Sequence, residues 1–197
     1  VKTTENAYRD VNIAFANELS LMSEELDVDV WELIDLANRH PRVNILSPGP
    51  GVGGHCIAVD PYFLMACAPK TTDLIAQSRQ VNEHKPEWVV QRVLRRAERF
   101  KQPRIACLGL AYKPDIDDLR ESPALRIVRE LAGRVQGELR VVEPNLQSHD
   151  EFALTDLDAA LSGADIVLVL VAHRQFKRIA PHLLAEKIII DTCGALR

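Results

Sequence analysis

The sequence lacks the features that mark nucleic-acid-binding and membrane-spanning proteins. Its 24 Lys and Arg residues are outnumbered by 28 Asp and Glu residues. The resulting net charge of -4 argues against general nucleic-acid binding, which normally needs a positive surface. No apolar run approaches the roughly 18 residues of a membrane-spanning helix, and the longest one, 166–172, has the length of a strand. We therefore expect neither a nucleic-acid partner nor a membrane partner.

Metal-binding and dinucleotide-binding motifs are also missing. The four cysteines form no CxxC pair and no zinc-type spacing with histidine, so no metal site is expected. With no signal peptide recognisable, they are expected to be reduced thiols in the cytoplasm, Cys67 and Cys107 as part of the core. No GxGxxG fingerprint follows any apolar run, which argues against an ordinary dinucleotide-binding domain. What is present is the composition of a globular protein, with 47% hydrophobic residues over 197 positions.

The spacing of apolar residues changes near residue 102. Before it, a spacing of three and four predicts helices at 3–26, 30–39, 62–68, 72–82 and 86–100, with Pro86 in the first turn of the last one. After it, apolar runs predict strands at 104–111, 139–142, 166–171 and 188–190, separated by helices at 122–134, 156–162 and 175–184. Such alternation favours a parallel sheet covered on both faces. The predicted fold class is α/β: a helical domain at 1–102, then a small Rossmann-like domain at 103–197.

An irregular segment at residues 47–56 separates the second and third predicted helices. It has four glycines and two prolines between positions 48 and 55, and such glycines can let the backbone approach a ligand. Cys56 ends this segment, where backbone N–H groups can stabilise a thiolate and make it a nucleophile. Asp60 follows at a predicted helix start. The alternative is a small buried cysteine beside a structural turn.

Other candidate residues are polar and basic. Lys2, Asn6 and Arg9 share one side of the first predicted helix, where they either polarise a substrate oxygen or form an ordinary solvated face. His40 and Arg42 precede the glycine-rich segment and either bind an anion or interact with a helix C-terminus.

A polar loop follows the first predicted strand, at the edge of a parallel sheet where ligands usually bind. Lys113 and Arg120 of this loop can meet phosphates there, and the helix that begins near Ser122 adds its positive end. An ordinary polar surface loop is the alternative.

Four of these segments, taken together, resemble the UDP-glucose/GDP-mannose dehydrogenase family. They are KTTENAYRDVNIAFANE (2–18), HPR (40–42), PGPGVGGHCIAVDP (48–61) and KPDIDDLRES (113–122). The likeness covers the whole chain and is strongest to the branch that oxidises UDP-N-acetyl-D-mannosamine. It implies a protein of three parts: an NAD-binding Rossmann domain, a central helical dimerisation domain and a Rossmann-like domain facing the UDP-sugar. Because this sequence resembles only the last two, we expect a fragment that is inactive alone and forms a homodimer through the helices before residue 102.

The resemblance also implies a mechanism. The sugar C6 alcohol is oxidised to a carboxylate by two NAD, with the intermediate bound to Cys56 as a thiohemiacetal and then a thioester. In this scheme Lys2 and Asn6 stabilise the oxyanion and move protons, while Asp60 is associated with the hydrolytic water. The resemblance also implies that Arg120 contacts the NAD pyrophosphate. The residues that it implies contact the sugar nucleotide are Arg9, His40, Arg42, Gly53, Tyr112 and Lys113.

Two questions about substrate and function stay open at this point. The C2 epimer UDP-N-acetyl-D-glucosamine is an alternative substrate, and a non-catalytic sugar-nucleotide-binding module is an alternative function. The chain also departs from its relatives at Cys193, where they often carry a basic residue. A substrate contact at that position is therefore not predicted.

Overall fold

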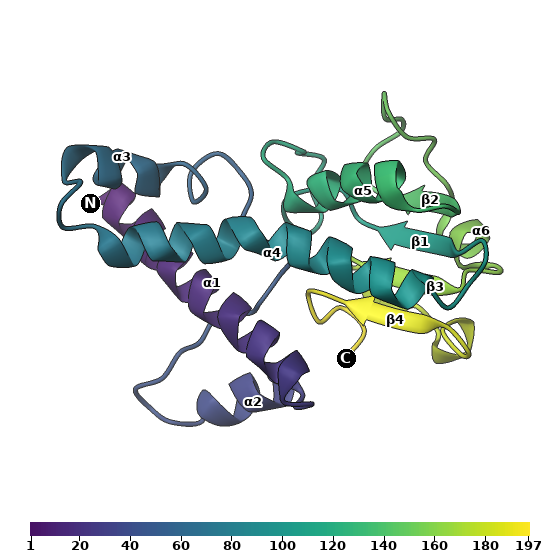
Figure 1. Cartoon of the computed structure of the whole chain (residues 1–197), viewed down its shortest axis with the longest axis horizontal. Coiled ribbons are helices and arrows are strands. Elements are labelled where there is room, and N and C mark those ends of the chain that lie inside the picture. Colours follow the sequence, from purple (N-terminus) through teal and green to yellow (C-terminus); the bar gives the residue numbers. More distant parts are fainter.

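Helices make up the first half of the chain and a four-stranded sheet the second, as the apolar spacing predicted (Figure 1). The structure is a computed structural model that describes residues 1–197. Its helical half contains α1 (Lys2–Glu25), α2 (Val30–Ala37), α3 (Asp60–Cys67) and α4 (Asp73–Ala97). The second half contains β1 (Arg104–Leu108), α5 (Pro123–Arg134), β2 (Glu138–Val142), α6 (Leu157–Leu161), β3 (Ile166–Val169), η1 (Phe176–Arg178), η2 (Pro181–Leu183) and β4 (Ile188–Asp191). None of the helices combines the length and the apolar character needed to cross a membrane.

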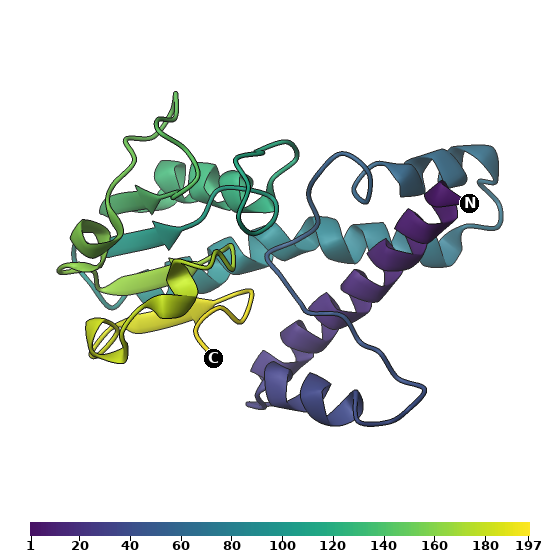
Figure 2. The ribbon, with the colours of Figure 1, turned by 180° about the vertical axis from the view of Figure 1, so that it is seen from behind.

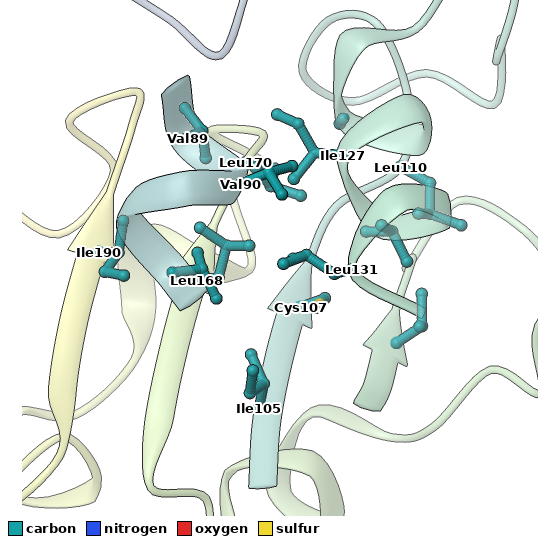
Figure 3. Packing of buried hydrophobic residues seen from close by; sticks show 14 of the residues in the cluster. Val89, Val90, Ile105, Cys107, Leu110, Ile127, Leu131, Leu168, Leu170 and Ile190 are labelled. Carbon is teal, nitrogen blue, oxygen red and sulfur yellow. The ribbon is translucent and has the colours of Figure 1, made fainter. Parts of the chain in front are cut away.

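The four strands form one parallel sheet in the order β2-β1-β3-β4. Helices α4 and α5 cover one face, where Val90 and Leu131 pack over Cys107 and Leu168 of the strands (Figure 3). The opposite face is covered by α6 and η1, with Phe176 fully buried against it. The prediction of a parallel sheet covered on both faces is therefore confirmed.

Helix α4 is one continuous helix, whereas the sequence predicted two helices with Pro86 starting the second. Pro86 lies inside the 25-residue helix. Proline removes one backbone hydrogen bond from a helix interior. Here α4 is packed on both sides of Pro86, against α1 through Asn82 and against the sheet through Val89 and Val90. Burial of these residues outweighs the missing hydrogen bond, and α4 joins the two halves.

Two smaller predictions also need correction. Cys67 is exposed at the end of α3, whereas Cys107 lies in the core as predicted. The predicted helix at 175–184 is instead the pair of short 3-10 helices η1 and η2, separated before Pro181. Ile179 and Ala180 between them are extended, and Pro181 restricts Ala180 to that backbone conformation.

Helix α1 contacts α4 through a buried network of polar side chains. The buried carboxylate of Asp10 accepts hydrogen bonds from Arg79 Nη1 at 2.7 Å and from Asn82 Nδ2 at 2.8 Å. Asn17 joins the same network by donating to Asn82 Oδ1 at 2.9 Å, and its own Oδ1 accepts from the Gly49 amide at 2.9 Å. Charge-assisted bonds of this kind are strong when buried. The bond from the Gly49 amide to Asn17 attaches the glycine-rich segment to α1 where it crosses that helix (Figure 2).

Candidate active site

The predicted catalytic residues Asn6 and Asp60 meet where α1 packs against α3, and Cys56 lies on the turn before Asp60. Asn6 is buried and donates its Nδ2 to Asp60 Oδ2 at 2.7 Å. The Asp60 amide in turn donates to the Cys56 carbonyl at 2.8 Å, so Cys56 and Asp60 lie on one turn that leads into α3. A single side-chain hydrogen bond therefore ties α1 to the turn that carries the thiol, across 54 residues of sequence.

Cys56 differs from the core cysteine in its accessibility. It is half-buried and free, whereas Cys107 is completely buried in the sheet. Burial raises the pKa of the Cys107 thiol to about 12, which keeps it protonated and unreactive. Burial is also the main cause that raises the pKa of Cys193. The alternative of a sealed structural cysteine does not apply to Cys56.

The other two candidate site residues of α1, Lys2 and Arg9, are more exposed than Asn6. Arg9 approaches the Asn6 side chain, with Nη1 3.5 Å from Oδ1. Lys2 is exposed at the first residue of α1 and makes no hydrogen bond or ion pair. The structure thus brings Asn6 to the Cys56 turn, while Lys2 stays free at the same end of the helix.

The glycine-rich segment packs against the loop that follows β1. A Cβ on Gly53 would lie 2.5 Å from the Glu121 carbonyl oxygen, and one on Gly54 would lie 2.7 Å from the Tyr112 ring. The Gly54 amide donates to the Arg120 carbonyl at 3.1 Å. These glycines therefore permit close approach of two protein segments, where the sequence suggested approach to a ligand. The contact brings Tyr112 and Arg120 beside Cys56.

Arg120 is already engaged by a carboxylate. Its Nε and Nη2 donate to Asp118 at 3.0 Å and 2.6 Å. These bonds are the main cause that raises the pKa of Arg120, and the ionised forms of Tyr112 and Cys56 add smaller contributions of the same sign. The guanidinium therefore lies within electrostatic range of the thiol. An anion that binds Arg120 has to share it with Asp118.

Lys113 is the free cation of this loop. It is exposed and forms no ion pair, and its Nζ lies 5.8 Å from the centre of the Tyr112 ring. An ammonium group that has no carboxylate partner remains available to a phosphate.

His40 and Arg42 are not brought to this site within one chain. They follow α2, which lies at the end of α1 opposite to α3 (Figure 1). Helix α1 has 24 residues, and at 1.5 Å per residue it spans about 36 Å. Both residues are exposed, and the Arg42 amide donates to His40 Nδ1 at 3.3 Å.

The residues after β1 do not fit the pyrophosphate of a dinucleotide. In dinucleotide-binding domains, backbone N–H groups at this turn bind the phosphates. Here the amides of Leu110 and Ala111 donate to Glu143 Oε2 at 2.7 Å and 3.1 Å. This internal carboxylate occupies the donors. Burial raises the pKa of Glu143, but hydrogen bonds from His173 and from the Leu110 and Asn145 amides outweigh burial and lower that pKa overall.

Glu143 and His173 were not among the sequence candidates. Glu143 directly follows β2, the position at which dinucleotide-binding domains carry an acidic residue, and this was the one available signal. His173 follows β3 with no motif to mark it.

Comparison with known proteins finds family models in both halves of the chain. The central domain of the UDP-glucose/GDP-mannose dehydrogenase family matches residues 1–84, and the UDP binding domain of that family matches residues 106–197. The chain belongs to this family. The predicted resemblance is confirmed.

Individual relatives agree with the family models. The chain is 54% identical to an NDP-N-acetyl-D-galactosaminuronic acid dehydrogenase of Ralstonia nicotianae, over 98% of this chain and 47% of that protein. It is 51% identical to the UDP-N-acetyl-D-mannosamine dehydrogenase of Salmonella typhi, over 100% of this chain and 50% of that protein. The chain thus spans about half the length of the curated relatives it matches.

Among solved structures, the chain is similar to a UDP-D-ManNAc dehydrogenase from Pyrococcus horikoshii. The TM-score is 0.88 at 39% identity, over 100% of this chain and 48% of that one. The predicted α/β fold is that of UDP-sugar dehydrogenases. No comparison separates the two predicted domains at residue 102, so that boundary stays a prediction.

Proposed function

We propose that this chain is the catalytic-cysteine and UDP-sugar-binding part of an NAD-dependent UDP-sugar 6-dehydrogenase. The observation that carries the proposal is the hydrogen bond between Asn6 and Asp60, which ties α1 to the turn of the accessible Cys56. The Rossmann-like domain supports it from the other side with the exposed cation of Lys113 and with Arg120. A nucleophile beside a cationic loop suits a substrate that combines a reacting sugar with a diphosphate.

The side chains suggest how the acid forms. The thiolate of Cys56 adds to the C6 aldehyde, and the resulting thiohemiacetal loses a hydride to become a thioester. The Asn6 amide has two N–H groups; one is given to Asp60, and the other is free for the oxyanion on C6. Asp60 uses only Oδ2 for Asn6, so Oδ1 remains to accept a proton from the water that hydrolyses the thioester. Lys2 adds a positive charge at the same end of α1.

Most contacts to NAD, the hydride acceptor, are expected from residues other than these 197. NAD supplies hydride acceptance in both oxidation steps, and only Arg120 of this chain is assigned to its pyrophosphate. Because the Leu110 and Ala111 amides are bound to Glu143, the turn after β1 does not offer these two donors to that pyrophosphate. We infer that the 197-residue chain alone reduces no NAD.

Substrate contacts are assigned to Arg9, Gly53, Tyr112 and Lys113, which lie around Cys56 or on the loop beside it. His40 and Arg42 follow α2, which lies at the end of α1 opposite to α3 (Figure 1). They contribute to a sugar-nucleotide site only where a second copy brings them there. A homodimer through the helices before residue 102 is therefore part of the proposal.

The substrate proposed is UDP-N-acetyl-D-mannosamine, with UDP-N-acetyl-D-glucosamine as the rival. Relatives at similar identity are named for mannosamine and for galactosaminuronic acid, so the comparisons favour an N-acetylated amino sugar. Assays of the full-length protein with each epimer decide between them. The other rival, a binding module without catalysis, predicts UDP-sugar binding with no turnover.

Replacement of the nucleophile tests the catalytic assignment. In the full-length dehydrogenase, Cys56→Ala is expected to abolish acid formation, because no covalent adduct can form. Cys67→Ala is the matched control, since Cys67 is an equally free but exposed thiol at the end of α3. Uronic acid release and NADH are measured with UDP-N-acetyl-D-mannosamine. Acid formation by Cys56→Ala at the parent rate would refute the assignment.

A further inference from the structure

Two buried side chains hold the backbone on either side of Lys113. The Ala111 amide, two residues before it, donates to Glu143 Oε2 at 3.1 Å. The Asp115 amide, two residues after it, donates to His173 Nδ1 at 2.9 Å. Glu143 is 3% exposed and His173 is completely buried, so neither can touch a ligand directly. Their hydrogen bonds to the loop that presents Lys113 go to its main-chain amides.

Glu143 and His173 also bind each other, so the two supports form one unit. His173 Nε2 lies 3.1 Å from Glu143 Oε2. Since Nδ1 accepts the Asp115 amide, the proton of the neutral ring is on Nε2 and is donated to the carboxylate. The carboxylate further accepts the Leu110 amide at 2.7 Å and both the amide and the side chain of Asn145 at 3.1 Å. Every partner of Glu143 is a donor.

The far end of this loop is fixed as well. Asp115 has a positive φ of 61°, a conformation that costs energy for a residue other than glycine and persists only when its surroundings hold it. Its carboxylate accepts the Arg174 amide at 3.0 Å and Arg174 Nε at 2.8 Å. Strand ends β2 and β3 thus hold the loop that follows β1 in one conformation.

We propose that Glu143 and His173 are positioning residues for binding of a nucleoside diphosphate, acting through Lys113. This inference rests on the proposed function, in which Lys113 contacts the UDP moiety. A loop and a lysine side chain that become ordered only on binding lose conformational entropy, which weakens affinity. A loop that is already held in the binding conformation loses less entropy and binds more tightly. The buried pair supplies this order from behind the loop, while the ammonium of Lys113 stays exposed to the ligand.

The substitution Glu143→Gln tests the role of the carboxylate with the smallest change in shape. The carboxamide of glutamine has one oxygen and one NH2 group. The NH2 group cannot accept a hydrogen bond, so either the Leu110 and Ala111 amides or Asn145 lose their acceptor. We expect UDP to bind the 197-residue chain at least about fivefold more weakly in isothermal titration calorimetry, with the far-ultraviolet circular dichroism of the parent at 25 °C. Glu138→Gln is the matched control, because Glu138 is an exposed residue of β2 that pairs with Arg140.

A double-mutant cycle separates positioning from general destabilisation. If Glu143 acts through Lys113, then Glu143→Gln has little further effect on UDP affinity in a Lys113→Ala background. If Glu143→Gln fails to fold, the same cycle is measured with His173→Gln and Lys113→Ala. In His173→Gln, Glu143 keeps its bonds to the backbone amides. Amide hydrogen exchange is expected to become faster at Ala111 and Asp115 and to stay unchanged in β3.

The outcomes distinguish this inference from the proposed function. Additive effects of Glu143→Gln and Lys113→Ala, or parent UDP affinity in both Glu143→Gln and His173→Gln, overturn the positioning role and leave the proposed function in place. Parent affinity in Lys113→Ala overturns the assignment of Lys113 and the inference with it. Weakened binding that is non-additive with Lys113→Ala, together with local exchange, supports the inference.

Discussion

Single glycines set how closely the helical half approaches the Rossmann-like domain. A Cβ on Gly53 would lie 2.5 Å from the Glu121 carbonyl oxygen and 2.7 Å from Pro123 Cδ. Both neighbours are held by the start of α5, so neither can move without displacing that helix. We expect Gly53→Ala to lower the free energy of unfolding by about 1–3 kcal/mol through overpacking, as measured by urea denaturation.

Gly133 in α5 provides the opposite case for the same substitution. A Cβ there meets nothing within 4 Å, and alanine is favoured over glycine in a helix interior by about 1 kcal/mol. Gly133→Ala is therefore expected to leave stability unchanged or to raise it. Equal effects of the two substitutions would contradict the packing argument for Gly53.

At the residue scale, the sequence marks candidate residues where a local motif is present and gives no signal where a role depends on burial. Cys56 and Asp60 are candidates because a glycine-rich segment and a helix start mark them, and their role stays a proposal. Glu143 and His173 were missed because each lies alone at a strand end, and only the parallel sheet places the two side by side. Cys67 was wrongly assigned to the core, because helix spacing does not show which face α3 turns to solvent.

At the scale of elements, helix α4 carries a buried lysine with no carboxylate hydrogen bond. Lys85 is 2% exposed; its Nζ contacts the Ser20 hydroxyl of α1 and lies 4.3 Å from the centre of the Trp88 ring. Burial, aided by the charge of Arg92, lowers the pKa of Lys85 to about 7. Protonation of Lys85 therefore lowers the free energy of unfolding.

The pH dependence of unfolding tests this assignment for Lys85. Between pH 7 and the ordinary lysine pKa of 10.5, the unfolded state binds more protons than the folded state. Raising the pH across this window therefore stabilises the fold, with a slope that approaches about 1.4 kcal/mol per pH unit. We expect this contribution to vanish in Lys85→Met, which should be more stable than the parent at pH 6 in urea denaturation.

Lys70→Met is the control for this pH series, because Lys70 is exposed between α3 and α4. Its pH profile should follow that of the parent. The assignment is wrong if the free energy of unfolding changes with pH from 6 to 9 in the same way for the parent and for Lys85→Met. Protonated Lys85 would then not destabilise the folded state.

The elements themselves were predicted well in type and less well in extent. Apolar spacing located all four strands and five of the six α-helices, because burial of one face fixes that spacing. It broke α4 at Pro86, since the local rule for proline carries no information on packing against α1 and the sheet. It gave no sign of the buried polar network around Asp10, because polar side chains carry no apolar spacing.

At the scale of the whole molecule, exposed apolar side chains are confined to the helical half. The large hydrophobic residues that are exposed are Val1, Tyr8, Phe15, Met22, Leu26, Val28, Leu36, Val43, Tyr62, Phe63 and Leu74. None lies beyond residue 74, so the Rossmann-like domain has no comparable surface. Such a concentration of apolar side chains is typical of an interaction surface.

Three of these residues form a single stripe on α1. Tyr8, Phe15 and Met22 are seven residues apart, which places them on one face of the helix, and that face is not used by the Asp10 network toward α4. A helix face of this kind is self-complementary about a twofold axis, because the same side chains can meet from two copies. The stripe is the feature that the proposed homodimer would bury.

We therefore expect the 197-residue chain to be dimeric at micromolar concentration and Phe15→Glu to make it monomeric. Two copies of the introduced carboxylate would lie unpaired in an apolar contact, which disfavours association strongly. Light scattering coupled to gel filtration measures the mass directly. Ala132→Glu is the matched control, since it adds the same charge to an exposed position of α5 in the Rossmann-like domain and should leave the dimer intact. A parent chain that is monomeric, or a Phe15→Glu variant that stays dimeric, places the apolar stripe outside the subunit interface.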